Sequence, residues 1–279
     1  MSESLLFPVA PSSTGPSVGD LLRAWRQRRR RSQLDLALEA GISQRHLSFL
    51  ESGRSSPSRE MVLKLAQHLA VPFREQNRLL VAAGFAPVHG ERSLDDPALH
   101  VAIGAVRQIL KGYEPHPAIA VDRYWTMVFA NAAIEPFLAG VDPELLQPPV
   151  NALRLSLHPK GLAARILNFR EWRDHILARL AEQVEVSADP KLIDLIDELK
   201  AYPDPSAGRD AGETDTSVFG GVAVPLKLAS EAGPLDFLTT TTVFGTALDV
   251  TLSELAIEAF FPANDFTAEA FRRLLEGRL

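Results

Sequence analysis

The sequence predicts two domains, an all-α bundle of five short helices followed by an α+β domain. The second domain is expected to hold a five-stranded antiparallel sheet with a large helical insert. Three observations support this fold class. Apolar stripes with helical spacing, separated by capping residues, fill residues 17–86. Runs rich in β-branched and aromatic residues occur only later in the chain. The net charge also changes sign between the two parts.

Charge separates the two predicted domains clearly. The 279-residue chain has a net charge of −6, which by itself argues mildly against a nucleic-acid partner. Residues 1–90 hold 12 basic and 7 acidic residues, whereas residues 91–279 hold 17 and 28. A basic N-terminal part joined to an acidic remainder indicates that only the first part binds DNA.

Composition excludes several classes of function. The chain has no cysteine, so disulfides, thiol catalysis and cysteine-ligated zinc are excluded, and its seven histidines are scattered, so no metal site is expected. The first residues lack the features of a signal peptide, and no apolar run is long enough to span a membrane. Motifs for nucleophilic, metal-dependent or phosphate-binding catalysis are missing. These features predict a cytoplasmic protein that is not an enzyme and contacts no membrane.

The chain begins with a segment rich in Pro, Ser and Gly, and we expect residues 1–16 to form a flexible arm. Ser17 with Asp20 predicts a capping box that opens the first helix, whose apolar face includes Leu22 and Trp25. Five arginines follow within residues 26–31. Such a run is typical of a solvated helix end and also of phosphate contacts. Both interpretations can hold, because Arg26 is expected to point inward and its neighbours outward.

Residues 32–54 predict two short helices joined by a tight turn. Ser32 and Asp35 predict a second capping box, and an apolar stripe of Leu34, Ala37 and Leu38 follows. Gly41 stands where a helix needs a left-handed terminating residue. This arrangement is a helix-turn-helix.

The second of these helices has two faces. Leu47 and Leu50 share the face expected to be buried. The opposite face carries an amide, a guanidinium, a hydroxyl and an aromatic ring, which are groups that read base edges in the major groove. This face is formed by Gln44, Arg45, Ser48 and Phe49, and Ser43 caps the helix.

Further helices complete the first domain. Ser58 predicts the start of a fourth helix, and a fifth ends near Phe85. A segment with two prolines and several charges follows as a linker. The predicted organisation is therefore an arm at 1–16, a DNA-binding domain at 17–86, a linker at 87–97 and a second domain at 98–279.

The first domain resembles the Xre-type repressor DNA-binding domains, through S-Q, L-A-L-E-A-G-I-S-Q and L-S-F-L-E-S-G-R. The resemblance implies a repressor-like five-helix bundle that binds double-stranded DNA. It further implies that Gln33 and Arg54 contact phosphates, that Gln44, Arg45 and Ser48 face bases, and that Arg26 pairs with Glu51. Phe49 stands where the family often has a polar base reader. It is expected either to pack partly buried or to contact a thymine methyl group.

The second domain begins with a predicted helix over residues 98–110. The run HPAIAVDRYWTMVFAN predicts two strands joined by a turn at residues 122–124, and Asn131 is expected to cap the helix that follows. Helices are expected to about residue 202 and an exposed loop over 203–216. The last elements are predicted strands at 217–228, 234–244 and 254–261 and a helix at 268–276. In the last strand, Leu255, Ile257, Ala259 and Phe261 point one way and Glu258 the other.

This order of elements is that of a PAS domain. The segments NALRLSLHPKGLA, LNFREW, ELKAYP and TTTTVFGTALDVTLSELAIEAFFP make the chain similar to the MmyB-like regulators. These join an Xre-type domain to a PAS-like ligand-binding domain, and the similarity extends over residues 18–275. It implies a transcription regulator with a small-molecule cavity between the sheet and the flanking helices.

Aromatic and hydroxyl residues on the predicted strands and polar residues near them are the candidates for lining this cavity. For each apolar residue, ordinary core packing is the alternative, and the threonines are also good strand formers. Asn131 is also a natural helix cap, and His158 precedes a proline as loop residues often do. The candidates are Trp125, Phe129, Asn131, Arg154, His158, Trp172, Phe237, Thr239 and Thr241.

Basic residues in the helical insert, among them Arg154 and His158, alternate with leucines. A cavity with an apolar body and a cationic mouth suits an amphipathic acid such as a fatty acid, or an apolar secondary metabolite. The alternative is that the leucines are core and the basic groups solvated. No other cofactor is expected.

The predicted function is therefore that of a homodimeric transcription regulator that binds a palindromic operator and responds to a small ligand. The main alternative is a regulator whose second domain is a ligand-free module for dimerisation or protein interaction.

Overall fold

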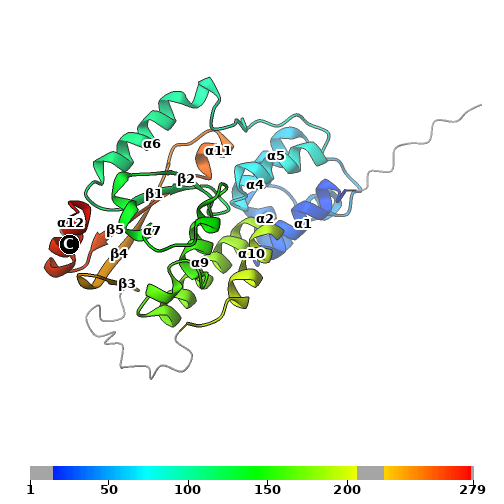
Figure 1. Cartoon of the computed structure of the whole chain (residues 1–279). Coiled ribbons are helices and arrows are strands. Elements are labelled where there is room, and N and C mark those ends of the chain that lie inside the picture. The colour runs from blue at the N-terminus through cyan, green and yellow to red at the C-terminus, as the bar shows by residue number, and fades with distance from the viewer. Residues whose placement is uncertain (1–14, 206–222, 278–279) are drawn as a thin grey trace, which may run out of the picture. The chain divides into compact units, whose positions relative to one another are not determined.

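The computed structural model describes residues 15–205 and 223–277, and the chain divides into two compact units, Met1–His89 and Gly90–Leu279 (Figure 1). Most of the predicted N-terminal arm and of the predicted loop at 203–216 lies outside the described residues. Each unit has its own apolar core.

Five α-helices form the described part of the first unit, as expected from the sequence. Serine caps begin four of them, and both predicted capping boxes, Ser17 with Asp20 and Ser32 with Asp35, are present. Gly41 adopts the left-handed conformation, with a φ of 60°, at the turn after the second helix. The helices are α1 (Val18–Arg28), α2 (Gln33–Glu39), α3 (Gln44–Glu51), α4 (Arg59–His68) and α5 (Phe73–Ala82).

The core of the first unit differs from the prediction in α2. Leu36 and Ala37 are buried there, whereas Leu34 and Leu38 are 50% and 70% exposed. The predicted stripe of Leu34, Ala37 and Leu38 is therefore wrong for its two leucines. Leu36 and the C-cap residue Ala40, four positions apart, lie on the buried side of α2. The helix is so short that its apolar spacing did not decide which face points inward.

The second unit contains the predicted antiparallel sheet and helices around it. Its elements are η1 (Pro97–Leu99), α6 (His100–Gly112), β1 (Ala118–Val121), β2 (Met127–Ala130), η2 (Ala132–Ile134), α7 (Glu135–Leu138), η3 (Pro143–Leu146), α8 (Ala152–Leu157), η4 (Ala163–Arg165), α9 (Phe169–Ser187), α10 (Pro190–Ala201), β3 (Leu226–Ser230), β4 (Gly233–Val243), α11 (Val250–Ser253), β5 (Ala256–Pro262) and α12 (Asp265–Leu275). The first of the three late strands begins only at Leu226, and residues 217–222 of its predicted span lie outside the described residues.

The five strands are ordered β2-β1-β5-β4-β3, and every neighbouring pair is antiparallel. Residues directly opposite one another in such pairs project from the same face of the sheet. Glu258 of β5 is opposite Ile119 of β1 and Thr241 of β4. These three side chains therefore lie on one face, in the middle of the sheet.

Helices cover both faces of the sheet. On one face, Ile103, Val106 and Leu110 of α6 form a cluster with Ile257 and other residues of β1 and β5. The other face, which carries Glu258, is covered by the helical insert from α7 to α10, and its core continues to Phe271 of α12 (Figure 1). The candidate pocket lies within this second layer.

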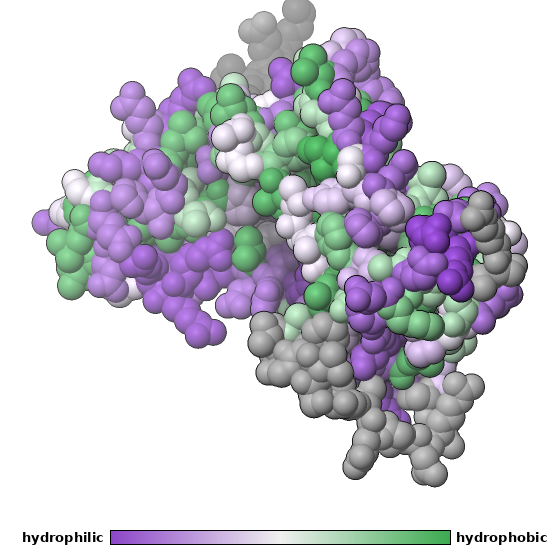
Figure 2. Space-filling model, turned by 90° about the vertical axis from the view of Figure 1, so that its left-hand side faces the viewer, coloured by the Kyte–Doolittle hydropathy of each residue, from purple (hydrophilic) through white to green (hydrophobic). Residues whose placement is uncertain are grey.

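On the face shown in Figure 2, hydrophilic residues are interspersed with hydrophobic ones. Among the helices of the described residues, none has both the length and the hydrophobicity to cross a membrane.

Candidate functional site

Helix α3 presents a polar face outside the first core. The Ser43 hydroxyl caps this helix by accepting a 3.1 Å hydrogen bond from the His46 amide. Gln44 and Arg45 are exposed in its first turn, and Ser48 is half-buried one turn later. This face therefore offers an amide, a guanidinium and a hydroxyl to a partner, as major-groove reading requires.

Phe49 lies on the same face between two arginines. The guanidinium carbons of Arg45 and Arg54 are 5.3 and 5.8 Å from the centroid of its ring. Such cation–π contacts hold an aromatic ring and two positive groups together at the surface. Phe49 is only half-buried, so its ring remains partly accessible.

A buried ion pair fixes α3 against α1. The Glu51 carboxylate has no exposed surface, and the guanidinium of Arg26 donates to both of its oxygens, at 2.6 and 2.9 Å. The Gln33 amide donates to the same carboxylate at 2.8 Å. Burial raises the pKa of Glu51, but the hydrogen bonds from Arg26 and Gln33 outweigh this effect and hold the pKa below its ordinary value. The expected Arg26–Glu51 pair is confirmed.

The arginine run does not form a uniformly outward cluster. Arg29 donates to the backbone carbonyls of Leu69 and Ala70 at the end of α4, and Arg31 pairs with Glu39. The expectation that all neighbours of Arg26 face outward is therefore wrong for Arg29. Its side chain satisfies helix-end carbonyls that have no partner within the helix.

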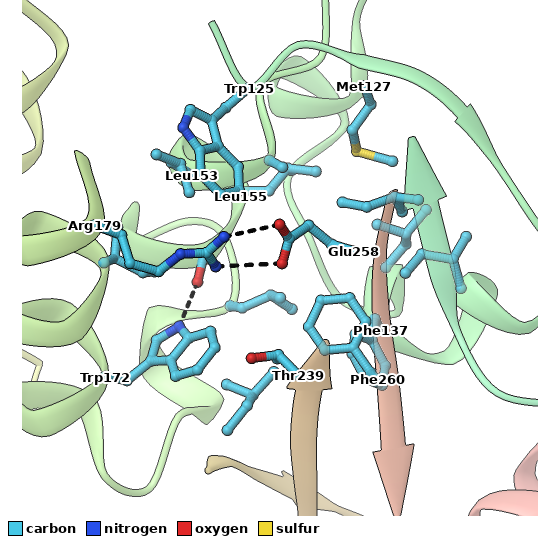
Figure 3. A pocket seen from close by; sticks show the side chains of 18 residues that line it. Trp125, Met127, Phe137, Leu153, Leu155, Trp172, Arg179, Thr239, Glu258 and Phe260 are labelled. Carbon is cyan, nitrogen blue, oxygen red and sulfur yellow. Dashed lines mark hydrogen bonds and ion pairs between the residues drawn. The ribbon is translucent and has the colours of Figure 1, made fainter. Parts of the chain in front are cut away.

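An apolar pocket of about 80 Å³ lies between the sheet and the helical insert of the second unit (Figure 3). All five strands of the sheet and helices α7, α8 and α9 contribute to its wall. The apolar lining includes Ile119, Met127, Phe137, Leu155, Ile176 and Phe260.

The polar end of the pocket is an ion pair between α9 and β5. Arg179 donates to both Glu258 oxygens, at 2.9 and 3.3 Å, and to the Thr241 hydroxyl at 3.0 Å. Thr241 in turn donates to Glu258 at 2.9 Å. The Glu258 side chain is 5% exposed and that of Arg179 is 30% exposed. The carboxylate is thus satisfied inside the protein, and the cation reaches toward solvent.

Trp125 covers this ion pair from the β1–β2 turn. Its ring centroid is 5.0 Å from the Arg179 guanidinium carbon, and its indole N–H donates to Gln183 at 2.9 Å. Trp125 has a φ of 63°, a left-handed conformation that is strained for a bulky residue. Such strain persists only where the surrounding contacts hold it. Besides accepting from the Trp125 indole, Gln183 donates to the Arg123 carbonyl at 2.7 Å and so holds the same turn.

A second hollow of about 210 Å³ is also lined by the ion pair. It shares Trp125, Arg179 and Glu258 with the apolar pocket, and the rest of its lining includes charged residues such as Arg123 and Glu254 beside the apolar Val121 and Ala256. Arg123 pairs with Glu254 and with Asp189. The Arg179–Glu258 pair therefore lines both hollows.

Four of the nine predicted ligand-site residues lie at this pocket. Trp125, Trp172 and Thr239 line it, and Thr241 holds the ion pair. The Trp172 indole N–H donates to the Ser156 hydroxyl at 2.9 Å, and the Thr239 side chain extends into the pocket (Figure 3).

Two predicted residues on or after β2 lie elsewhere. A register shift between Ala120 and Val121 places Phe129 opposite Ala120, on the α6 face, where Arg107 lies 4.1 Å from the ring centroid. Asn131 makes no capping hydrogen bond but binds three backbone groups, including the Ala118 amide at 3.0 Å. Neither residue lines the pocket.

The other three also lie outside the pocket. Phe237 is fully buried, with its ring centroid 5.0 Å from that of Phe137 in the core. Arg154 forms a bidentate pair with Glu198, and the His158 ring packs edge-on against Tyr202. The expected cationic mouth is therefore wrong, because the basic residues expected to form it do not line the pocket. Acidic side chains or backbone carbonyls bind them elsewhere. These partners are Glu198 for Arg154, Asp142 for Lys160, the Phe137 and Ala139 carbonyls for Arg165, and Asp204 for Arg170.

The sequence interpretation missed Arg179 and Glu258 as site residues. Both had a detectable signal. Glu258 is the single charged residue in the otherwise apolar strand β5, and Arg179 follows Trp172 and Ile176 at the i+7 and i+3 positions of one helical face. A charge on an inward-facing stripe indicates a buried polar site.

The fold and the exposed recognition helix of the first unit define a helix-turn-helix protein. A helix-turn-helix family model matches residues 22–76, and the model of the MmyB-like transcription regulator ligand binding domain matches residues 104–274. The chain belongs to the MmyB-like transcription regulator family.

The curated relatives match only about a quarter of the chain, less than the two family models cover together. Uncharacterized HTH-type transcriptional regulators of Mycobacterium bovis and Mycobacterium tuberculosis are 42% identical to it over 67 residues. These residues make up 24% of this chain and 26% of each relative. The similarity thus spans about a quarter of the curated relatives.

Proposed function

We propose that this protein is a sequence-specific DNA-binding transcription regulator whose affinity for its operator changes when a small apolar or amphipathic molecule occupies the second unit. It acts as a homodimer on a palindromic operator, each copy reading one half-site. The ligand acts by linkage, because a molecule that binds one arrangement of the second unit shifts the equilibrium between arrangements of the dimer.

The polar face of α3 supports the DNA-binding part of this proposal. Gln44, Arg45 and Ser48 face base edges, and Phe49 contacts a thymine methyl group. Ser43 at the helix N-terminus, Gln33 and Arg54 face the phosphates. Gln33 retains a further amide hydrogen for this contact, because the Glu51 carboxylate uses one of the two.

The observation that carries the ligand part is the apolar pocket inside the domain that the family model describes as ligand-binding. Large apolar side chains surround it, with few polar groups to orient a bound molecule, as in most small-molecule sites.

A second candidate function rests on the size of the pocket. Its volume of about 80 Å³ is below the roughly 300–1,000 Å³ of most small-molecule sites. If side chains fill this interior permanently, the second unit serves only for dimerisation or protein interaction.

One experiment separates these functions. The operator is first selected from random DNA with the full chain and mapped by footprinting. Operator affinity and melting temperature are then measured with a series of apolar small molecules. A ligand that raises the melting temperature, as mass action requires, and shifts operator affinity supports the regulator with a sensor. If no compound changes the melting temperature or the operator affinity, the result supports a second unit that serves only for dimerisation or protein interaction.

A further inference from the structure

We propose that the apolar pocket selects uncharged ligands, because Arg179, the one cation among the described residues that line it, is already paired with Glu258. This inference rests on the proposed sensor function and names its ligand class: an aliphatic or aromatic molecule with a neutral hydrogen-bonding group, such as an alcohol, ester or amide. Glu258 is then the residue that excludes carboxylates.

The geometry of the ion pair leaves no free charge for an anion. Arg179 directs both terminal nitrogens at Glu258 (Figure 3). One of these nitrogens also donates to the Thr241 hydroxyl. Of the described residues that line the pocket, Arg179 and Glu258 are the two with charged side chains. The pocket therefore carries no net charge, although it contains a guanidinium.

A carboxylate ligand would have to take Arg179 away from Glu258. The Glu258 side chain is 95% buried, so it would remain inside the protein without its cation. An unpaired buried charge is strongly unfavourable, and the new ion pair would only replace the old one.

The neighbouring basic groups Arg123 and His175 are not available to neutralise the charge of Glu258 if Arg179 moves away. Arg123, in the neighbouring hollow, pairs with Asp189 and Glu254. His175 lies one turn before Arg179 on α9, but burial, followed by the nearby Arg179 charge, lowers its pKa below the ordinary value and favours its neutral form near pH 7.

A neutral ligand meets none of these costs. Its apolar part would contact Leu155, Ile176 and Phe260, and the Arg179–Glu258 pair would remain intact. The Thr239 hydroxyl extends into the pocket and can donate to the oxygen of an alcohol, ester or amide, or accept from an alcohol O–H or amide N–H. Because the pocket is small, a longer ligand also requires a side chain to move, and unbranched Met127 is the most adaptable one in the wall.

The test compares matched probes on the full chain near neutral pH. Straight-chain 1-alkanols from butanol to dodecanol and the carboxylic acids of equal length are titrated below their micelle concentrations by calorimetry. We expect an alcohol to bind on the order of tenfold more tightly than its matched acid. Acids binding as tightly as alcohols would overturn the inference and leave the sensor function standing.

Two variants isolate the role of Glu258. In Glu258→Gln the guanidinium loses its charged partner, so we expect the acid to gain about tenfold in affinity while the alcohol changes little. Glu198→Gln removes the acid of the Arg154–Glu198 pair, outside the pocket, and should leave both probes unaffected. A thermal melt without ligand shows whether each variant folds.

The outcomes distinguish the two proposals. Acid affinity unchanged in a folded Glu258→Gln protein would show that Glu258 does not exclude carboxylates and would overturn the inference alone. If neither alcohols nor acids bind the wild-type chain at any length, the sensor function itself fails, and the selectivity inference with it. The wild-type comparison decides the inference even if Glu258→Gln does not fold.

Discussion

At the scale of single residues, each unit contains a buried glutamate held by an arginine from another element. Glu51 is paired with Arg26 in the core of the first unit, where the pair ties α3 to α1. Glu258 is paired with Arg179 at the edge of a pocket. An Arg–Glu ion pair thus stabilises the fold in the first unit, and we propose that a second such pair selects the ligand in the other.

The first pair leads to a stability prediction. Removing one partner, as in Arg26→Met, should lower the free energy of unfolding by about 3–5 kcal/mol, because Glu51 remains buried without a cation. Arg26→Met combined with Glu51→Leu should cost less than either change alone. A double-mutant cycle measured by denaturant unfolding tests this, and additive costs would contradict it.

The same pair predicts a pH dependence. The pKa of Glu51 lies below its ordinary value of 4.5 in the folded state, so its stabilising contribution is present above that value and is lost as pH falls through the folded pKa. The difference in unfolding free energy between the wild type and Glu51→Gln should therefore shrink as pH is lowered below about 4.5. A constant difference down to pH 2 would rule out this linkage.

Base reading is a third prediction at this scale. Arg45→Ala should weaken binding to the selected operator by about 1–3 kcal/mol and relax the preference at one base pair. Arg59→Ala, at the start of α4 and outside the reading face, is a matched control. Competition binding with single-base operator variants measures both effects, and an equal loss on unrelated DNA would instead indicate a phosphate contact.

At the scale of elements, Gly19 sets how closely α1 approaches α3. A Cβ atom at this position would lie 2.5 Å from the Leu50 carbonyl oxygen and 2.9 Å from that of Glu51. Both atoms belong to the backbone of α3, so they cannot move without shifting the helix. The position of the recognition helix α3 therefore depends on position 19 of α1 being a glycine, which has no Cβ atom.

This contact predicts opposite effects for two helical glycines. Gly19→Ala should destabilise the chain by about 1–3 kcal/mol, because the new methyl group overlaps α3. Gly104→Ala in α6 has nothing within 4 Å of the new methyl group and should stabilise by roughly 0.5–1 kcal/mol through helix propensity. Thermal and denaturant unfolding of both variants tests this contrast, and equal effects would contradict it.

At the scale of the whole molecule, charge is divided between the two parts of the chain. Residues 1–90 carry a net charge of +5 and residues 91–279 carry −11. Phosphate attraction is therefore confined to the first part, while the second repels DNA. This asymmetry favours binding through the helix-turn-helix unit alone.

The proposed dimer predicts a spacing rule for the operator. Two half-sites about 34 Å apart, centre to centre, place both recognition helices on one side of the duplex. Adding about half a helical turn between the half-sites should lower the affinity of the full chain toward that for a single half-site, because the second reading helix faces away. Gel-shift titrations with spacing variants measure this, and equal affinity at all spacings would exclude a rigid dimer.

The sequence was sufficient for features that depend on neighbouring residues. Ser17, Ser32, Ser43 and Ser58 predicted four helix starts because a cap needs only its own side chain and the next turn. Alternating and helical spacings likewise predicted the five strands and the two kinds of domain. The family pattern added the Arg26–Glu51 pair, which residue spacing alone would not reveal.

Only the tertiary structure determined which side chains meet. The register shift in β1–β2 turned Phe129 away from the pocket, and Arg154 pairs with the distant Glu198 outside the pocket instead of forming a cationic mouth. Glu258 faces Arg179 because β5 lies in the centre of the sheet under α9. Local sequence predicted the helices and strands, but the inward face of α2, the side on which Phe129 lies and the charge of the site depend on contacts that only the folded chain makes.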